Sequence, residues 1–141
     1  MWTTKKGDLL ALRLYPGDDF FKGLENACRQ NHIKTGIIIC AIGQIKNFKL
    51  GFFREKGDYC PDEFEVPHEL LGLSGNIILQ DNIYKFHIHA IVGDNNKHVF
   101  GGHLLQATCE ITNEIFILET GLELKRERED ETGLEGLFPT N

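Results

Sequence analysis

The amino-acid sequence predicts an α+β fold in which one main helix packs on a sheet of about seven strands. Two observations carry this prediction. A single early segment has apolar residues at helical spacing, whereas the segments after it are β-branched or alternate between apolar and polar residues. No repeat or Pro/Ser-rich linker divides the 141 residues, so we expect one domain over residues 1–141. Its core would run from about 8 to 126, followed by a charged and apolar tail over 127–141.

The first expected elements are a strand over Leu9–Leu14, a turn at 15–18 and a helix over 19–30. Asp18 or Asp19 stands where an N-cap carboxylate would accept the first free backbone N–H groups of the helix. The apolar face of this helix predicts a core contact, and it is formed by Phe20, Phe21, Leu24, Ala27 and Cys28.

Strands are expected after this helix. Residues 35–42 are β-branched and continuously apolar, which predicts a strand covered on both faces. The alternation at 45–52 is typical of a half-buried strand. Further strands, with a hairpin-like turn at 94–97, are expected at 70–79 (one or two strands), 84–93, 98–109 and 114–121.

The C-terminal segment opens with seven charged residues of mixed sign at 125–131. Such a run predicts a solvated strand end followed by a surface tail. Leu134, Leu137 and Phe138 then recur in a polar context. They would let the tail dock onto the body of the domain or onto a neighbouring subunit.

The charge balance disfavours generic binding to nucleic acid. Fifteen basic and 21 acidic residues give a formal net charge of −6, whereas proteins that neutralise phosphates usually carry a basic surface. The apolar runs are too short to span a bilayer, and residues 1–8 lack the apolar core of a signal peptide. We therefore expect a cytoplasmic protein without a membrane partner, whose four cysteines are free thiols.

Two of the six histidines form the sharpest local pattern, His87-Ile88-His89. Residues two apart in a strand share one face, so both imidazoles should point the same way and lie close enough to reach one metal ion. His103 follows the next turn, and if the two strands pair as a hairpin it lies across from this pair. Gly101 and Gly102 before it leave room for the close approach of another chain or of a ligand.

Three neutral imidazoles with one open coordination position suit a divalent transition metal, zinc first. The alternative is three histidines on a wet sheet face, bonded to carboxylates or water. Glu114 could orient a ligand imidazole from behind, or it could be a solvent-facing strand residue.

The remaining histidines are weaker candidates. We expect His98 to be exposed after a turn, His68 to lie in a loop after Pro67, and His32 to lie on the surface. Nucleophile-elbow and phosphate-loop motifs are absent from the sequence. No catalytic residue is identified, so enzymatic activity stays open.

The combination of residues 86–90, residues 101–105 and Glu114 resembles the plants-and-prokaryotes-conserved (PPC) domain. Residues 12–18, 41–45 and 69–77 resemble its first strand and turn, a small-residue turn and its central strand. The resemblance implies a mostly antiparallel sheet assembled as a homotrimer, and a metal site at the positions of His87, His89 and His103, as in solitary prokaryotic members.

Plant members of this family follow AT-hook motifs in DNA-binding nuclear regulators, but this sequence contains no Arg-Gly-Arg-Pro core. The preferred function is therefore a small homotrimeric metal-binding domain, with a regulatory or an enzymatic role. A DNA-binding transcriptional regulator is the first alternative, and a protein–protein interaction module is the second.

Overall fold

The computed structural model describes residues 1–140, which form one helix and nine strands. Seven strands make one antiparallel sheet in the order β1-β2-β7-β6-β5-β3-β4. A further pairing of β3 with β7 closes β3, β5, β6 and β7 into a ring. The bounds of these strands are β1 (Trp2–Lys6), β2 (Leu9–Leu14), β3 (Thr35–Glu55), β4 (Asp58–Phe64), β5 (His68–Gln80), β6 (Ile83–Gly93) and β7 (Val99–Glu119). The predicted α+β class, with one helix on a seven-stranded sheet, is confirmed.

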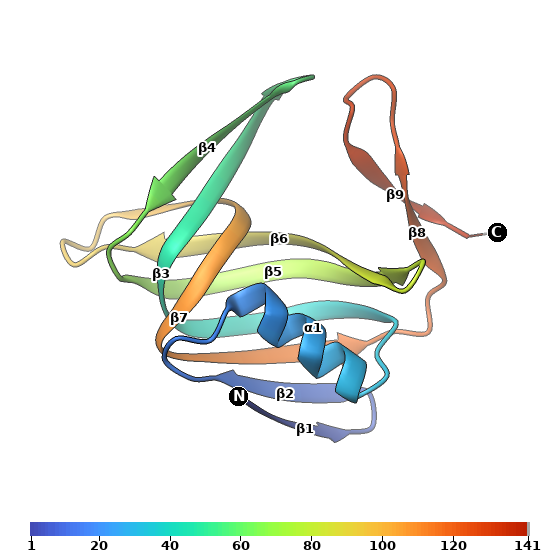
Figure 1. Cartoon of the computed structure of the whole chain (residues 1–141), viewed down its shortest axis with the longest axis horizontal. Coiled ribbons are helices and arrows are strands. Elements are labelled where there is room, and N and C mark those ends of the chain that lie inside the picture. Colours follow the sequence, from blue (N-terminus) through green and yellow to red (C-terminus); the bar gives the residue numbers. More distant parts are fainter. Residues whose placement is uncertain (141) are drawn as a thin grey trace.

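The two longest strands, β3 and β7, differ from the sequence prediction, which divides each of them in two. Each is continuous over 21 residues, and they stay paired through several register shifts, one of them between Gly43 and Ile45. These irregularities let one strand bend without ending. Figure 1 shows the result: β3 crosses the lower part of the molecule and then turns upward to pair with β4.

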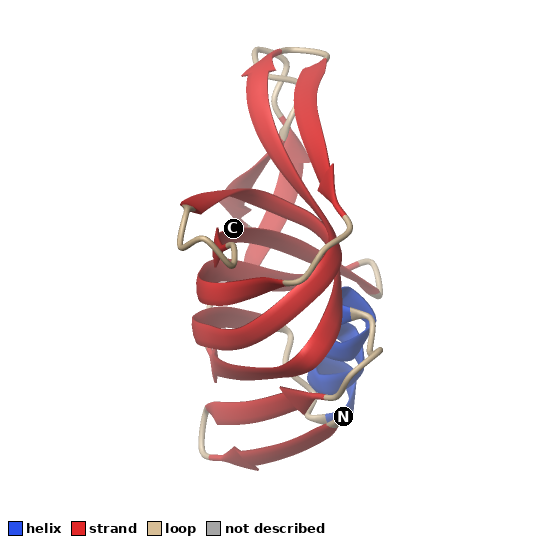
Figure 2. Ribbon diagram, turned by 90° about the vertical axis from the view of Figure 1, so that its left-hand side faces the viewer, coloured by secondary structure: helices blue, strands red, loops and turns tan. Residues whose placement is uncertain are grey.

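The helix α1 (Phe20–Gln30) begins one residue after the predicted start at 19 and ends where the sequence predicts. The Asp19 carboxylate accepts the Lys22 backbone N–H at 2.9 Å, so Asp19 is the N-cap. The buried face of the helix includes Phe20, Leu24 and Ala27, and it packs on one side of the sheet (Figure 2). Within residues 1–140, no helix combines the length and apolarity needed to span a membrane.

On the face of the sheet opposite α1, the expectation of a strand covered on both faces is wrong. The strand at 35–42 is covered on one face only: Ile37, Ile39 and Ile42 are 44%, 53% and 56% exposed. Their neighbours Ile38 and Ala41 are buried in the core beneath α1. The sequence pattern is that of a doubly covered strand, but no second layer lies over these residues within the described chain.

The C-terminal segment forms a hairpin, β8 (Leu124–Arg128) with β9 (Glu135–Pro139), in place of the expected surface tail. This C-terminal hairpin lies on the outer face of β5: the Arg126 backbone N–H donates to Gln80 Oε1 at 2.7 Å, and Gln80 Nε2 donates to the Arg126 carbonyl at 3.3 Å. At its tip, the Asp130 carbonyl accepts a hydrogen bond from Lys56 Nζ in the β3–β4 turn. Two hairpin arms thus meet above the sheet (Figure 1).

Candidate metal centre

Two neighbouring strands bring three histidines together. His87 and His89 alternate with the inward-facing Ile88 on β6, and His103 on β7 lies directly opposite His89 in the antiparallel register. A Cβ at Gly101 would lie 2.4 Å from the Ala90 carbonyl oxygen, so only glycine allows the strands to approach this closely here. The cluster predicted from the sequence is therefore formed by local strand pairing.

The geometry of the histidine cluster fits one metal ion. One ligand nitrogen from each of the three side chains can be chosen so that all lie within 4.8 Å of one another. His87 Nε2 and His89 Nε2 are 3.2 Å apart. Tetrahedral coordination with bonds of about 2.0–2.1 Å places ligand nitrogens about 3.3–3.4 Å from each other. Small rotations of the imidazoles would bring all three nitrogens to such an ion.

Burial and nearby charges favour the neutral forms of His87 and His103, which are the forms that bind metal. Burial first, and then the nearby charges of His87, His89 and Arg126, together lower the pKa of His103 to about 4. Burial, then His89 and Arg126, also lowers the pKa of His87. At neutral pH, protons therefore compete only weakly with a metal ion for the nitrogens of His87 and His103.

A cavity of about 330 Å³ opens beside His87 and His103. The Tyr59 ring stands edge-on to His103, with ring centres 5.5 Å apart. Gly51 leaves room for this ring, because a Cβ at position 51 would lie only 2.2 Å from the Tyr59 Cε1 atom. Arg126, from the C-terminal hairpin, reaches the same cavity. On the far side of His89, Ser74 and Gly101 line a second depression, of about 430 Å³.

The structure places Glu114 away from this cluster. Glu114 lies beside Arg13 and Ile42 in the sheet register and lines another depression, together with Trp2 and Phe116. It is not among the groups that gather with the three histidines.

Of the other three histidines, two lie where the sequence predicts and one, His68, does not. His98 is exposed and pairs with Asp94, with Nδ1 3.0 Å from Oδ2, and His32 is exposed, both as expected. His68, expected in a loop, instead begins β5 and is only 5% exposed. Its ring packs against an aromatic group formed by Phe48, Phe64 and Phe100.

Sequence reasoning missed Tyr59 and Arg126 as neighbours of the cluster. Tyr59 lies on β4, an edge strand containing Pro61 and several charges, which reads as loop. Arg126 lies in the charged run that predicts a solvated segment, yet it is 8% exposed. No local pattern sets Arg126 apart from the other six charged residues at 125–131.

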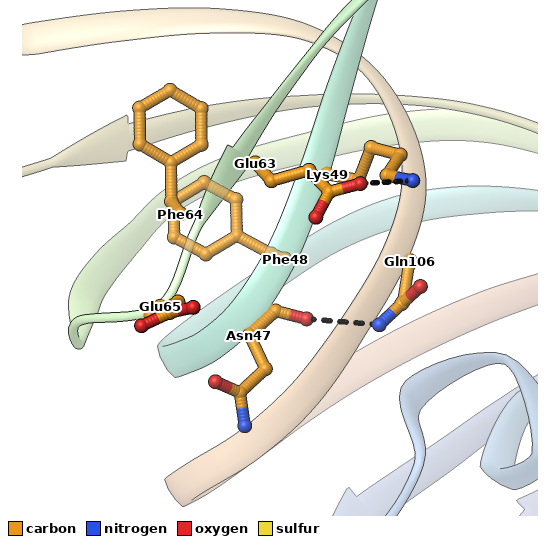
Figure 3. A pocket seen from close by; sticks show the side chains of 7 residues that line it. All are labelled: Asn47, Phe48, Lys49, Glu63, Phe64, Glu65 and Gln106. Atoms are coloured by element: carbon orange, nitrogen blue, oxygen red, sulfur yellow. Dashed lines mark hydrogen bonds and ion pairs between the residues drawn. The ribbon is translucent and has the colours of Figure 1, made fainter.

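A separate cavity of about 160 Å³ lies where β3 bends, lined in part by Asn47, Phe48 and Phe64 (Figure 3). Three of its polar side chains already have partners. Lys49 pairs with Glu63, and Gln106 Nε2 donates to the Asn47 carbonyl at 3.4 Å. Because the residues that line this cavity include no histidine or cysteine, the histidine cluster is the stronger candidate site.

Comparison with protein families finds a match over residues 1–121 to the Plants and Prokaryotes Conserved (PCC) domain. A metal-containing protein from Archaeoglobus fulgidus is 30% identical, with a TM-score of 0.84 over 95% of each chain. A plant- and prokaryote-conserved (PPC) protein from Pyrococcus horikoshii is 29% identical, with a TM-score of 0.80 over 94% of each chain.

A further solved structure, of a candidate DNA-binding protein from Bacteroides thetaiotaomicron, is 25% identical, with a TM-score of 0.91 over 99% of this chain and 98% of that one. Two curated Synechococcus proteins, both named bifunctional protein GlmU, are 30% identical over 118 residues. That match covers 84% of this chain but only 18% of either relative, so the chain spans about a fifth of their length.

Proposed function

Since this chain belongs to the Plants and Prokaryotes Conserved (PCC) domain family, we propose that it binds one divalent transition-metal ion through His87, His89 and His103 and acts as a homotrimer. The observation that carries the proposal is the convergence of three imidazole nitrogens within 4.8 Å of one another on one sheet face. Zinc is the first choice of metal, because three imidazoles and one open position are a common zinc arrangement.

The surroundings of the histidine cluster support a metal site that binds a further ligand rather than a purely structural one. A bound ion would supply a Lewis-acid centre with one coordination position open to water or to another ligand. Structural zinc sites normally use four protein ligands, whereas three gather here. The adjoining cavity of about 330 Å³ gives a small molecule access to His87 and His103. The relative from Archaeoglobus fulgidus, which is described as containing metal, has the same fold.

Metal content after dialysis tests the proposal. Protein purified without an affinity tag is loaded with zinc, dialysed against a mild chelator and analysed by mass spectrometry of the metal. We expect about one ion per chain in the wild type and a loss of most of it in His103→Ala, because two imidazoles hold zinc far more weakly than three.

His98→Ala is the matched control, since His98 is an exposed histidine at the entry to the same strand. It should retain the metal of the wild type. Equal metal retention in His103→Ala and the wild type would refute the assignment, and it would favour a protein–protein interaction module.

An exposed apolar face supports the homotrimer, which the PPC resemblance implies. In the sheet register Leu118 lies between Leu9 and Ile37, and Phe116 lies next to Ala11. The three aliphatic side chains and Phe116 are each 38–44% exposed. We call Leu9, Ile37, Phe116 and Leu118 the apolar face. A monomer would leave this contiguous surface in water, and two further copies of the chain would cover it.

A DNA-binding role is the second candidate, supported by the description of the Bacteroides thetaiotaomicron relative. The net charge of −6 opposes it. A binding assay with random-sequence duplex at physiological salt separates the two functions. Nanomolar binding, weakening with salt by a slope of several phosphates, would favour the DNA-binding role.

A further inference from the structure

The cavity beside His87 and His103 combines apolar walls with one buried cation. Leu105 and Leu134 contribute apolar surface, and the Tyr59 ring closes one side. The lining residues come from β4, β6, β7 and the C-terminal hairpin, so both hairpin arms help to enclose the cavity. Its volume of about 330 Å³ is at the small end of the range for small-molecule sites.

Arg126 is the buried cation, and the fold holds its side chain in place. Its Nη1 donates to the Glu135 carbonyl at 3.1 Å, and its Nη2 donates to Asn76 Oδ1. The Gln80 side chain forms hydrogen bonds with both the backbone N–H and the backbone carbonyl of Arg126. A guanidinium has five N–H donors, so three remain for a ligand. This is a prepared donor group rather than a mobile surface arginine.

The charges that line the cavity do not cancel. Lys85 and Glu135 form an ion pair with a nitrogen–oxygen distance of 2.9 Å and neutralise each other. Within residues 1–140, no carboxylate forms an ion pair with Arg126. An imidazole carries no charge when a ring nitrogen binds a metal, so a divalent ion held by the three histidines would keep its full charge. A dication and a guanidinium facing one partly buried cavity repel each other unless an anion lies between them.

We propose that this cavity binds a small carboxylate with a short apolar body, held between the open position of the metal and the Arg126 guanidinium. The inference rests on the proposed metal site. A planar carboxylate matches the two-pronged donor geometry of a guanidinium, and Leu105 and Leu134 would contact its hydrocarbon part. The negative charge of the carboxylate would offset the positive charges of the metal ion and of Arg126, which the histidine ligands do not neutralise.

Cobalt-loaded protein tests the proposal, because the visible absorption of Co²⁺ responds to a new ligand. Butyrate and inorganic phosphate are titrated separately into the wild type, Arg126→Gln and Arg128→Gln. Arg128 is the matched control, an exposed arginine on the same strand. We expect saturable spectral changes with butyrate in the wild type and Arg128→Gln, and an affinity weaker by about tenfold or more in Arg126→Gln, because a charged hydrogen bond is lost.

Each other outcome is decisive. Equal butyrate affinity in Arg126→Gln and the wild type, or a response to phosphate alone, would overturn the carboxylate assignment while leaving the metal site intact. Failure of the wild type to take up cobalt would instead remove the metal site itself. If Arg126→Gln does not fold by circular dichroism, Arg126→Lys keeps the charge without the two-pronged geometry. It should bind butyrate several-fold more weakly, and unchanged affinity would contradict the proposal.

Discussion

His103 shows how a single side chain sets the electrostatics of the candidate site. It is the histidine whose pKa is lowered to about 4, first by burial and then by His87, His89 and Arg126. The histidine cluster was predictable from the sequence, because it depends on the two-residue period of a strand and on one hairpin. Tyr59 and Arg126 were not, because they reach the site only through the bends of hairpins far away in the sequence.

The lowered pKa of His103 predicts a pH dependence for the stability of the metal-free protein. The unfolded chain has a histidine pKa near the ordinary value of 6.5. Between about pH 6.5 and 4 the unfolded state therefore binds more protons than the folded state, and stability is lost as pH falls through this window. After allowance for solvent screening at a half-exposed group, we expect His103 to account for about 1–2 kcal/mol of the loss.

Urea unfolding with a chelator present, at pH 7 and pH 4.5, measures this effect. The wild type should lose more stability between the two conditions than His103→Gln. Parallel losses in the two proteins would show that His103 does not carry the proton linkage.

At the scale of elements, close strand contact positions the cluster. Strand β5 pairs with β6 so that Asn76 lies opposite His87 and Ser74 opposite His89. The sequence predicted a strand here, although it left open whether 70–79 holds one strand or two. It could not predict that β3 and β7 each continue through a bend, since a register shift depends on the partner strand and leaves little local pattern.

Two glycines of β5 give a matched test of this contact. A Cβ at Gly75 would lie 2.3 Å from the His87 carbonyl oxygen, a backbone atom that cannot move aside alone. A Cβ at Gly72 would meet only Ile91 Cδ1, at 4.0 Å. We expect Gly75→Ala to destabilise the fold by about 1–3 kcal/mol or more, as overpacking does, and Gly72→Ala to change stability by about 0.5 kcal/mol or less.

Chemical denaturation of both variants measures the difference, and metal affinity should fall with stability in Gly75→Ala because His87 is displaced. Similar stability in the two variants would contradict the close pairing of β5 with β6.

At the scale of the whole molecule, one face of the sheet carries the core and the other carries the features open to partners. The helix side is closed by α1, while the apolar face and the histidine cluster lie on the other side. The patterning of one helical segment and about seven strands predicted the α+β architecture. The sequence could not show that one face of the apolar strand at 35–42 is exposed in the single chain. A strand covered by another chain and a strand covered within its own chain have the same apolar sequence pattern.

The apolar face predicts the assembly state. Light scattering should give a mass near three times the 16.0 kDa of one chain. Phe116→Glu, which puts a charge in the apolar face, should shift the mass towards that of one chain. Ile83→Glu is the control, because Ile83 is 63% exposed at the start of β6, outside the apolar face. A wild-type mass of one chain, or no shift in Phe116→Glu, would contradict the trimer through this face.

The central claim, one metal ion held by three histidines, is tested most directly by X-ray absorption at the zinc edge of the zinc-loaded protein. The account predicts three imidazole nitrogens at about 2.0–2.1 Å and one oxygen ligand at a similar distance. In His103→Ala, any residual signal should contain fewer imidazoles. A sulfur ligand at about 2.3 Å, or a wild-type ion with only one imidazole, would contradict the claim.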